Sequence, residues 1–318
     1  MMGQDIYPAP SGSKKRTDES LGFEYKYRTA SVEHFREMQE YVDRLKREGK
    51  LSDNETYQSY IENKIFEVPE DFSTAKSIIV LATFTKLMFV NFHWKGKAHE
   101  VMLPPQYYDD GVSVEAIQDT IQKDIIKKPG YKVERAKKIY LKHLAVRSGL
   151  GKYGKNNICY VDEFGSFITL YAFLTDFIFE EDNWRRVEMM RACRRCTICV
   201  DLCPTGCFRK DNFVIDAGRC VTLYNEIQGN FPSFIPSDAH NALMGCMRCQ
   251  WRCPLNLQVR RMTERVEDVT EEETRKILAG TPDKALLEAR TKKLKGYTPA
   301  TSEAYFPIFT RNLSVLIV

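Results

Sequence analysis

Two short stretches of this sequence share an unusual cysteine spacing: CRRCTICVDLCP, from Cys193 to Pro204, and CMRCQWRCP, from Cys246 to Pro254. The first reads Cys-x2-Cys-x2-Cys-x3-Cys-Pro, and the second repeats its later part as Cys-x2-Cys-x3-Cys-Pro. Together with Cys220 they hold eight of the ten cysteines of the chain. Because this spacing brings several thiols to one short segment, the two stretches predict a metal-binding module.

The first stretch has the spacing of bacterial ferredoxins, in which three thiolates hold one 4Fe-4S cluster and the fourth reaches the other cluster. Each cubane cluster needs four sulfur ligands, so the second stretch leaves a second cluster one ligand short. Cys220, in DAGRCVTLYNEI, can supply that ligand from upstream. We therefore predict two clusters with crossed ligands, the first held by Cys193, Cys196, Cys199 and Cys253 and the second by Cys203, Cys220, Cys246 and Cys249.

Zinc is the alternative metal, because Cys-x2-Cys pairs also bind zinc tetrahedrally. The third cysteine at the same spacing and the two Cys-Pro endings favour iron-sulfur clusters. Two cysteines stay outside this scheme. We interpret Cys159 and Cys207 as small buried hydrophobic residues, and Cys207 lies near enough in sequence to act as a substitute ligand.

The composition is that of a globular protein. The 318 residues are 43% hydrophobic and 28% charged, which permits a large buried core, and the formal net charge of +4 does not by itself indicate nucleic-acid binding. The longest apolar run, residues 77–92, contains Lys86 and is too short and too polar for a membrane span. The N-terminal residues lack the apolar segment of a secretion signal. We expect no transmembrane helix and a cytoplasmic location, where thiols stay reduced and bind metals.

Hydrophobic periodicity outside the cysteine stretches predicts helices mixed with a few strands. Helices are expected over residues 31–49, 54–65, 112–125 and 136–148, and strands over residues 76–85, 158–161 and 167–176. The predicted fold class is α+β, with α/β-like character and an inserted ferredoxin-like module. Its expected parts are a flexible arm at 1–28, an α/β core at 29–184, a dicluster module at 185–260, and a C-terminal helical segment at 261–318 that packs back on the core.

Residues 144–157, LAVRSGLGKYGKNN, resemble epoxyqueuosine reductases and, more distantly, reductive dehalogenases when taken with the two cysteine stretches. The ILAGT of residues 277–281 and the RNLSVLI of residues 311–317 resemble the same superfamily, so the resemblance covers roughly residues 65–318. It implies a nitroreductase-like core that binds a corrinoid beside a dicluster ferredoxin-like module.

The glycine-rich loop within this motif is the predicted cofactor-binding segment. Glycines permit close backbone approach, and the basic and amide side chains offer hydrogen-bond donors. The resemblance implies that their partner is cobalamin or the edge of a cluster, and a tight helix-to-strand turn with solvated basic residues is the alternative. The predicted cofactor-binding residues are Arg147, Gly149, Gly151, Gly154, Lys155 and Asn156.

The predicted proton donor departs from the family pattern. Epoxyqueuosine reductases carry a proposed proton-donating aspartate shortly before this loop, and this chain has Arg135 there. Their Asp-Tyr-His run has only a weak counterpart in QYYDDG, residues 106–111. A reduction still needs a proton source, for which Tyr107, Tyr108, Glu134 and Tyr140 are the candidates. Because reductive dehalogenases use a tyrosine, we predict Tyr108, Glu134 and Arg135 as the catalytic residues, the arginine lowering a tyrosine pKa or binding an anionic substrate.

These features predict an oxidoreductase with two 4Fe-4S clusters and cobalamin. An external low-potential donor, such as ferredoxin or flavodoxin, would reduce the second and more exposed cluster. The electron would then pass to the first cluster and to a base-off corrinoid, which reduces a small molecule or a modified nucleoside. Arg191, Arg194 and Arg195 would stabilise the reduced clusters or receive an acidic donor.

Two other functions stay open. One is a cobalamin-free electron-transfer protein that feeds a partner enzyme or a partner corrinoid protein. The other is a tRNA queuosine-type reductase, with tRNA lying across a set of basic residues. The alternative is that these residues are ordinary solvated surface residues. Those residues are Arg135, Lys137, Lys138, Lys142, Lys152, Lys292, Lys293 and Lys295.

Overall fold

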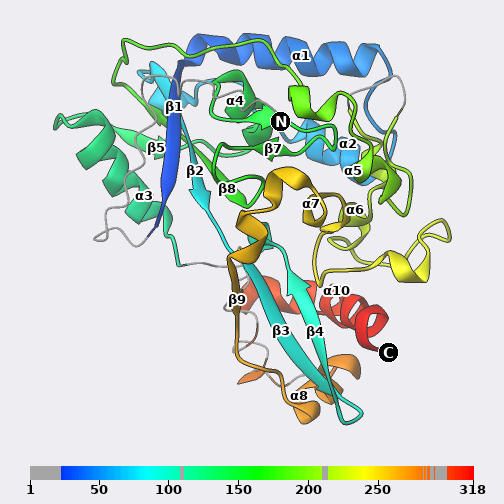
Figure 1. The fold of residues 1–318 in the computed structure, drawn as a ribbon. Helices are drawn as coiled ribbons and strands as arrows, with labels where there is room; N and C mark the ends of the chain where they lie inside the picture. The colour runs from blue at the N-terminus through cyan, green and yellow to red at the C-terminus, as the bar shows by residue number, and fades with distance from the viewer. Residues whose placement is uncertain are drawn as a thin grey trace, which may run out of the picture.

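The computed structural model is built around a four-stranded antiparallel sheet (Figure 1). It describes residues 23–107, 111–209, 214–281, 283, 285, 286, 290 and 299–318. The strand order is β1-β2-β8-β5, with bounds β1 Tyr25–Ser31, β2 Ser77–Phe84, β8 Ile168–Thr175 and β5 Val133–Arg135. Strand β2 is central and almost wholly buried, because its run of β-branched and aliphatic residues faces a layer of helices on each side.

Helices cover both faces of this sheet. Their bounds are α1 Phe35–Arg47, α2 Glu55–Glu62, α3 Val114–Thr120 with the π-helical turn η4 Ile121–Ile126, and α4 Leu141–Arg147, with short 3-10 turns η1 Val32–His34, η2 Glu70–Phe72 and η3 Pro105–Tyr107. On one face Met38 of α1 and Leu144 of α4 pack with Val80, and on the other face Ile117 of α3 packs with Leu81. The alternation of β2 side chains therefore gives the protein two cores, one on each side of the sheet.

A second structural unit extends below this sheet in Figure 1. A hairpin of β3 (Leu87–Trp94) and β4 (Lys97–Leu103) pairs antiparallel, and β9 (Thr263–Arg265) adds to β3 in parallel. Helices α8 (Glu271–Leu278) and α10 (Pro299–Ile317) pack on this hairpin in a third core. The C-terminal part thus returns to a strand that lies before the cysteine stretches, as the register Met88 to Glu264 shows.

The cysteine stretches lie between these two units in short helices and turns. They are η5 Arg191–Cys193, α5 Ile198–Asp201, η6 Ala217–Arg219, α6 Val221–Tyr224, η7 Ser237–Ala239, α7 Arg248–Trp251, η8 Pro254–Asn256 and η9 Val259–Arg261. Before them, β6 (Lys152–Tyr153) and β7 (Cys159–Tyr160) form a two-stranded ladder after α4. Figure 1 shows α5, α6 and α7 side by side between the main sheet and the β3–β4 hairpin.

The predicted mixed α and β fold class is confirmed. The expected strands at 76–85 and 167–176 are β2 and β8. The first three expected helices match α1, α2 and α3 with η4, and the fourth matches α4, which occupies only the later half of residues 136–148. Strand β1 begins at Tyr25, so the core starts inside the arm expected at 1–28, and residues 1–22 lie outside the described part. The C-terminal segment expected to be helical also contributes strand β9. Among the described helices, none is long and apolar enough to cross a membrane.

Candidate metal centre

The thiols of the first predicted set lie close together. Helices α5 and α7, one from each cysteine stretch, pack against each other and bring Cys253 back to the first stretch. Burial raises the pKa of the Cys199 thiol to about 11, and the neighbouring Cys193, Cys196 and Cys253 add to this rise. Thiols that perturb one another in this way lie within electrostatic reach. The crossed ligation expected for the first cluster therefore agrees with the fold.

The second predicted set converges in the same manner. Burial is the main cause that raises the pKa of Cys246, and the nearby Cys220 and Cys203 add to it. The pKa of Cys249 is raised by burial first and then by Cys246, Cys220 and Cys199. Because Cys199 belongs to the first set and Cys249 to the second, the two sets adjoin. An electron could therefore pass directly between clusters held at these positions.

The donor set suits two cubane clusters. Two adjoining groups of four soft thiol ligands are what two 4Fe-4S clusters require, and binding iron would deprotonate thiols whose pKa burial has raised. In the described ranges, no three His, Cys, Asp or Glu side chains come together closely enough to hold a single metal ion. The fit to clusters thus depends on the grouping and chemistry of the thiols.

Cys207 lies against the second set. Its Sγ is 3.5 Å from the Sγ of Cys203, and it also forms a side-chain hydrogen bond with Cys220. The hydrogen bond between Cys203 and Cys207 is the main cause that lowers the pKa of Cys203, to about 5. Cys207 is buried, as expected, and it also contacts two predicted ligands. It is placed either to replace one of them or to donate its S–H to a ligand sulfur.

The glycine-rich loop packs tightly against β7. Gly149 adopts a φ of +75°, a left-handed conformation that favours glycine. A Cβ placed on Gly151 would lie 2.5 Å from the Sγ of Cys159, and one placed on Gly154 would lie 2.7 Å from the ring of Tyr160. Gly151 and Gly154 therefore permit the loop to pack closely on β7. This packing is required whether the loop binds a cofactor or has only a structural role.

Two side chains of this loop reach the cluster ligands. Lys155 Nζ donates to the backbone carbonyl of Cys196 at 2.5 Å. The buried Asn156 donates to the Tyr160 hydroxyl at 2.9 Å, and Tyr160 in turn hydrogen-bonds to Cys253. The resemblance left cobalamin or the cluster edge as partners of this loop. These contacts bring Lys155 and Asn156 next to Cys196 and Cys253, two predicted ligands of the first cluster.

Arg147 has a different environment. Its guanidinium pairs with Glu37 of α1 and lies 4.5 Å from the ring centroid of Trp184. Neither Arg147 nor any of the other five predicted loop residues lines the cavity beside the clusters. These positions do not fit a role in holding a corrinoid in that cavity.

A cavity of about 310 Å³ opens beside the second cluster set. Its wall includes the predicted ligand Cys246 together with Tyr107, Lys142, Cys159 and Thr222. Lys142 lines the cavity, and its Nζ donates to the Asn157 carbonyl. Loss of hydration by the surrounding protein lowers the pKa of its ammonium group. Burial raises the pKa of Cys159 to about 12, so this thiol stays protonated. The size suits a small molecule or one nucleoside.

Two of the predicted catalytic residues, Glu134 and Arg135, are not at this cavity. Glu134 pairs with Lys132 at 2.7 Å, and Arg135 lies 5.9 Å from the ring centroid of Tyr171, because both residues belong to edge strand β5. Neither lines the cavity, so the structure does not bring these two predicted residues to it. Tyr108 falls outside the described residues. Tyr140 is half-buried among other tyrosines and does not line the cavity either.

Tyr107, one of the candidate proton sources, pairs with Glu226, which the sequence prediction missed. Tyr107, from η3, lines the cavity, and its hydroxyl donates a hydrogen bond to the Glu226 carboxylate. Burial raises the pKa of Glu226, and the Tyr107 hydrogen bond opposes that rise. A Cβ on Gly245 would lie 2.6 Å from the Tyr107 ring, so glycine is needed for the two segments to meet. The stretch YNEIQG around Glu226 carries no motif that could have identified it.

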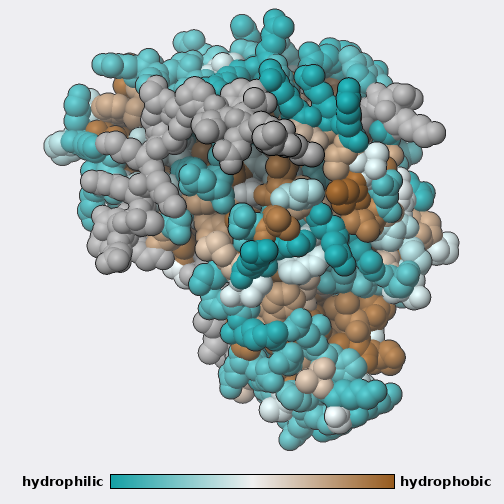
Figure 2. Space-filling view, viewed as in Figure 1, coloured by the Kyte–Doolittle hydropathy of each residue, from teal (hydrophilic) through white to brown (hydrophobic). Residues whose placement is uncertain are grey.

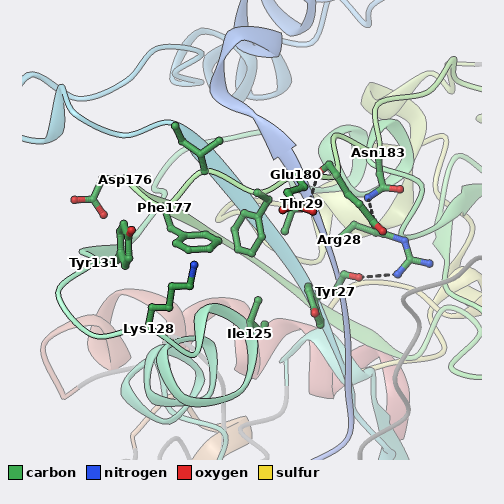
Figure 3. Close-up of a pocket in the computed structure, with 13 residues that line it drawn as sticks. Tyr27, Arg28, Thr29, Ile125, Lys128, Tyr131, Asp176, Phe177, Glu180 and Asn183 are labelled. Atoms are coloured by element: carbon green, nitrogen blue, oxygen red, sulfur yellow. Dashed lines mark hydrogen bonds between the residues drawn. The ribbon is translucent and has the colours of Figure 1, made fainter.

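A second and larger hollow, of about 570 Å³, lies at the edge of the main sheet (Figure 3). Figure 3 shows Tyr131, Phe177 and Lys128 on one side of it and Tyr27 on the other, with the Arg28 guanidinium turned away from the aromatic rings. Lys128 Nζ lies 5.5 Å from the ring centroid of Phe177. None of the predicted cluster ligands lines this hollow, so it is separate from the metal centre.

Comparison with known proteins defines the class of this module. Residues 192–256 match the family described as "4Fe-4S double cluster binding domain". That range contains all eight predicted ligands. The chain therefore carries a double 4Fe-4S cluster domain, and the zinc alternative loses its support.

The remaining comparisons show which proteins this chain is similar to. Epoxyqueuosine reductases of Bacillus subtilis (strain 168) and Escherichia coli (strain K12) are 34% and 33% identical over 113 and 122 residues, which is 36% and 38% of this chain but only 28% and 31% of those proteins. The structure of epoxyqueuosine reductase from Streptococcus thermophilus has a TM-score of 0.68 at 18% identity, covering 94% of this chain and 78% of that chain. A crystal structure of epoxyqueuosine reductase with an epoxyqueuosine-modified tRNA-Tyr stem loop has a TM-score of 0.65 at 20% identity, with the same coverage. The resemblance to epoxyqueuosine reductases is therefore confirmed in sequence and in fold.

Proposed function

We propose that this protein is an iron-sulfur oxidoreductase that reduces a modified nucleoside of tRNA, in the manner of the epoxyqueuosine reductases that it resembles. One observation carries the proposal: Cys246, a predicted ligand of the second cluster, lines a cavity that can hold a substrate. A protein that only passed electrons to a partner would have no need of such a cavity beside a cluster.

The proposed electron route runs from the surface inward. Apart from its three cysteines, every residue from Arg191 to Leu202 is exposed, so the first cluster lies near the surface. Cys246 instead has buried neighbours in Gly245 and Met247 and faces the cavity. Electrons would enter at the first cluster, pass to the second and leave into the cavity. This order is the reverse of the one expected from the sequence.

The reaction needs two electrons and two protons. An epoxide that accepts both becomes an alkene and releases its oxygen as water. Each 4Fe-4S cluster carries one electron, so two reduced clusters together hold the pair that one turnover consumes. The donor of those electrons is an external low-potential carrier, and the protons come from groups of this chain.

We assign proton delivery to Tyr107 and Glu226. Tyr107 lines the cavity, and Glu226 behind it has a raised pKa because it is buried. When Glu226 is protonated, it can donate to the Tyr107 oxygen while the Tyr107 hydroxyl donates to the substrate. This pair would replace the aspartate for which the chain has Arg135.

The corrinoid remains a prediction without support. The loop predicted to bind it contacts cluster ligands and α1, and the cavity beside Cys246 is of the size of small-molecule sites. We therefore propose no step at cobalt. If a corrinoid does bind, it would supply a strong one-electron reductant at the same cavity.

The test is turnover of a defined substrate. Anaerobically reconstituted holoprotein is reduced with dithionite and mixed with a tRNA stem loop that carries epoxyqueuosine, with and without added cobalamin, and the nucleosides are separated by mass. Loss of one oxygen from the modified base supports the proposal. An unchanged base, with both clusters reduced, would contradict it.

A matched substrate separates the remaining alternatives. The free epoxyqueuosine nucleoside tests whether the cavity accepts the base without RNA. Turnover of the nucleoside but not of the stem loop would point to a small-molecule reductase. Turnover only in the presence of cobalamin would restore the corrinoid prediction.

A further inference from the structure

The loop around the first cluster combines exposed apolar side chains with unpaired positive charge. Six of the twelve large hydrophobic residues exposed in the described ranges lie in two segments, 198–202 and 255–262. Cys253, just before the second segment, adjoins Cys193 and Cys199 in the first set. Both segments therefore border the same cluster. In Figure 2, brown side chains reach the surface among teal ones where α5 and α7 lie in Figure 1.

The charge of this patch is mainly positive. Arg194, Arg195, Arg252 and Arg261 are exposed, and none of them forms an ion pair within the described part of the chain. Asp201 is the one carboxylate between residues 191 and 202, and its oxygen accepts a hydrogen bond from Thr197. A patch that joins apolar contact area to unpaired arginines suits a protein partner with an acidic surface.

We propose that this patch, formed by residues 191–202 and 252–262, is the docking surface for a small acidic electron-carrier protein that reduces the first cluster. The inference rests on the proposed electron route and adds the place where electrons enter. The carrier would give up one electron to the first cluster for each encounter. RNA is the less suitable partner, because residues 191–202 contain no aromatic side chain on which a base could stack.

The test measures reduction of the clusters without any substrate. Holoprotein is mixed anaerobically with photoreduced flavodoxin as the acidic carrier, and the bleaching of cluster absorbance gives a second-order rate. In Arg194→Glu/Arg195→Glu this rate should fall by about ten- to a hundredfold at low ionic strength, because steering of the acidic carrier is lost. The wild-type rate should itself fall as salt is added.

Two controls separate docking from other effects. Arg47→Glu/Arg275→Glu makes the same change of charge at exposed arginines on α1 and α8, and should leave the rate within about twofold. Methyl viologen, a small cationic reductant, should reduce the wild type and both variants at rates that do not follow the loss seen with flavodoxin. If the first variant loses iron, Leu257→Ser/Arg261→Glu tests the same patch at residues outside the cysteine stretches.

Three results would overturn the proposal. They are equal slowing in the α1/α8 control, an unchanged flavodoxin rate in both patch variants, and loss of tRNA stem-loop binding with donor kinetics intact. Because no substrate is present, failure of the docking surface is distinguishable from failure of the proposed nucleoside reduction, which only the turnover assay reports.

Discussion

The two cluster-binding segments have nearly the same cysteine spacing but very different surroundings. Residues 191–202 are exposed except at the cysteines, whereas residues 242–247 are buried except at Cys246. Spacing fixes where sulfur ligands stand, and the rest of the fold decides what each cluster faces. The first segment faces solvent and the second faces the cavity. This difference is the basis of the proposed direction of electron flow, from the first cluster to the second.

The C-terminal helix accounts for the burial of the second segment. Asn312 of α10 donates from Nδ2 to the carbonyls of Asn225 and Leu243, both at 2.9 Å. Arg311 donates to the carbonyls of Tyr224 and Ile227. These bonds satisfy the backbone carbonyls of Tyr224, Asn225, Ile227 and Leu243. Without them, these carbonyls would need hydrogen bonds from water. The first segment has no such cover among the described residues.

The largest effect is expected from removing one cluster at a time. Cys246→Ala should lose the second cluster, about four irons per chain, and abolish turnover with every reductant, because the cluster at the cavity is gone. Cys199→Ala should lose the first cluster and abolish turnover with flavodoxin. Because methyl viologen needs no docking surface, it should restore part of the turnover in Cys199→Ala alone.

Iron analysis and EPR of the reduced proteins check these two variants, and circular dichroism shows whether the core is intact. If viologen restores Cys246→Ala and not Cys199→Ala, the direction of electron flow is the opposite one. The comparison of the two segments would then be wrong in its main conclusion.

The next largest effect is expected at the cavity side of the comparison. Tyr107→Phe and Glu226→Gln should each lower turnover by about a hundredfold to ten-thousandfold, while iron content and flavodoxin-driven reduction stay unchanged. The relay needs a protonated Glu226, and burial raises the pKa of this carboxyl. Turnover should therefore fall as pH rises through that raised pKa.

The pH profile distinguishes proton delivery from a structural role. In Glu226→Gln the high-pH loss due to this carboxyl should disappear, leaving a low and flatter profile. A variant that kept the wild-type profile at lower amplitude would assign Glu226 to packing. Tyr60, whose pKa the Glu226 charge helps to raise, gives a nearby control in Tyr60→Phe.

Cys207 should produce a smaller effect on the second cluster alone. If its thiol donates to a ligand sulfur, Cys207→Ala should keep both clusters and lower the potential of the second by roughly 50 mV, the equivalent of about 1 kcal/mol for one electron. Cys207→Ser keeps a donor and should shift the potential less. Redox titration followed by EPR measures both clusters at once.

A loss of iron in Cys207→Ala would show that Cys207 is a ligand in place of Cys203 or Cys220. The matched control is Cys159→Ala, which removes a buried thiol from the cavity wall. It should leave both potentials unchanged because Cys159 is not among the thiols that perturb the second set.

The sequence predicted the grouping of the thiols because ligand spacing is a local property. It could not predict the cavity, since Tyr107 and Glu226 are 119 residues apart and Glu226 belongs to no motif. Glu134 and Arg135 were chosen by their distance along the chain from a family motif, but strand β5 pairs them with β8 at the edge of the sheet. Which residues share a cavity depends on tertiary packing.

Several strands, among them β1, β3 and β4, were missed for physical reasons as well. Strand β1, YKYRTAS, alternates aromatic and basic residues and follows a polar N-terminal stretch, so it was included in an expected arm. In the structure Lys26 is buried, and its ammonium group donates to the Asp162 carbonyl at 2.8 Å. The β3–β4 hairpin was not predicted because its strands are only partly apolar. The helices that cover it, α8 and α10, lie far away in sequence.

The smallest effect is expected at Arg147, where the family resemblance and the structure differ most. Its contacts are Glu37 and Trp184, and the Trp184 indole also donates to Glu37 at 3.0 Å. Arg147→Met should lower the free energy of unfolding by about 1 kcal/mol or less, because Glu37 is half exposed. Cluster content and turnover should not change.

The pH dependence of that loss follows from Glu37. The Trp184 hydrogen bond is the main cause that lowers the pKa of Glu37, and His34 and Arg147 contribute. A carboxyl with a lowered pKa stabilises the fold fully above its unfolded pKa, and this contribution is lost as pH falls through the folded one. The difference between wild type and Arg147→Met in denaturant melts should therefore shrink in acid. If turnover falls instead while stability holds, Arg147 binds a cofactor and the loop does what the resemblance implies.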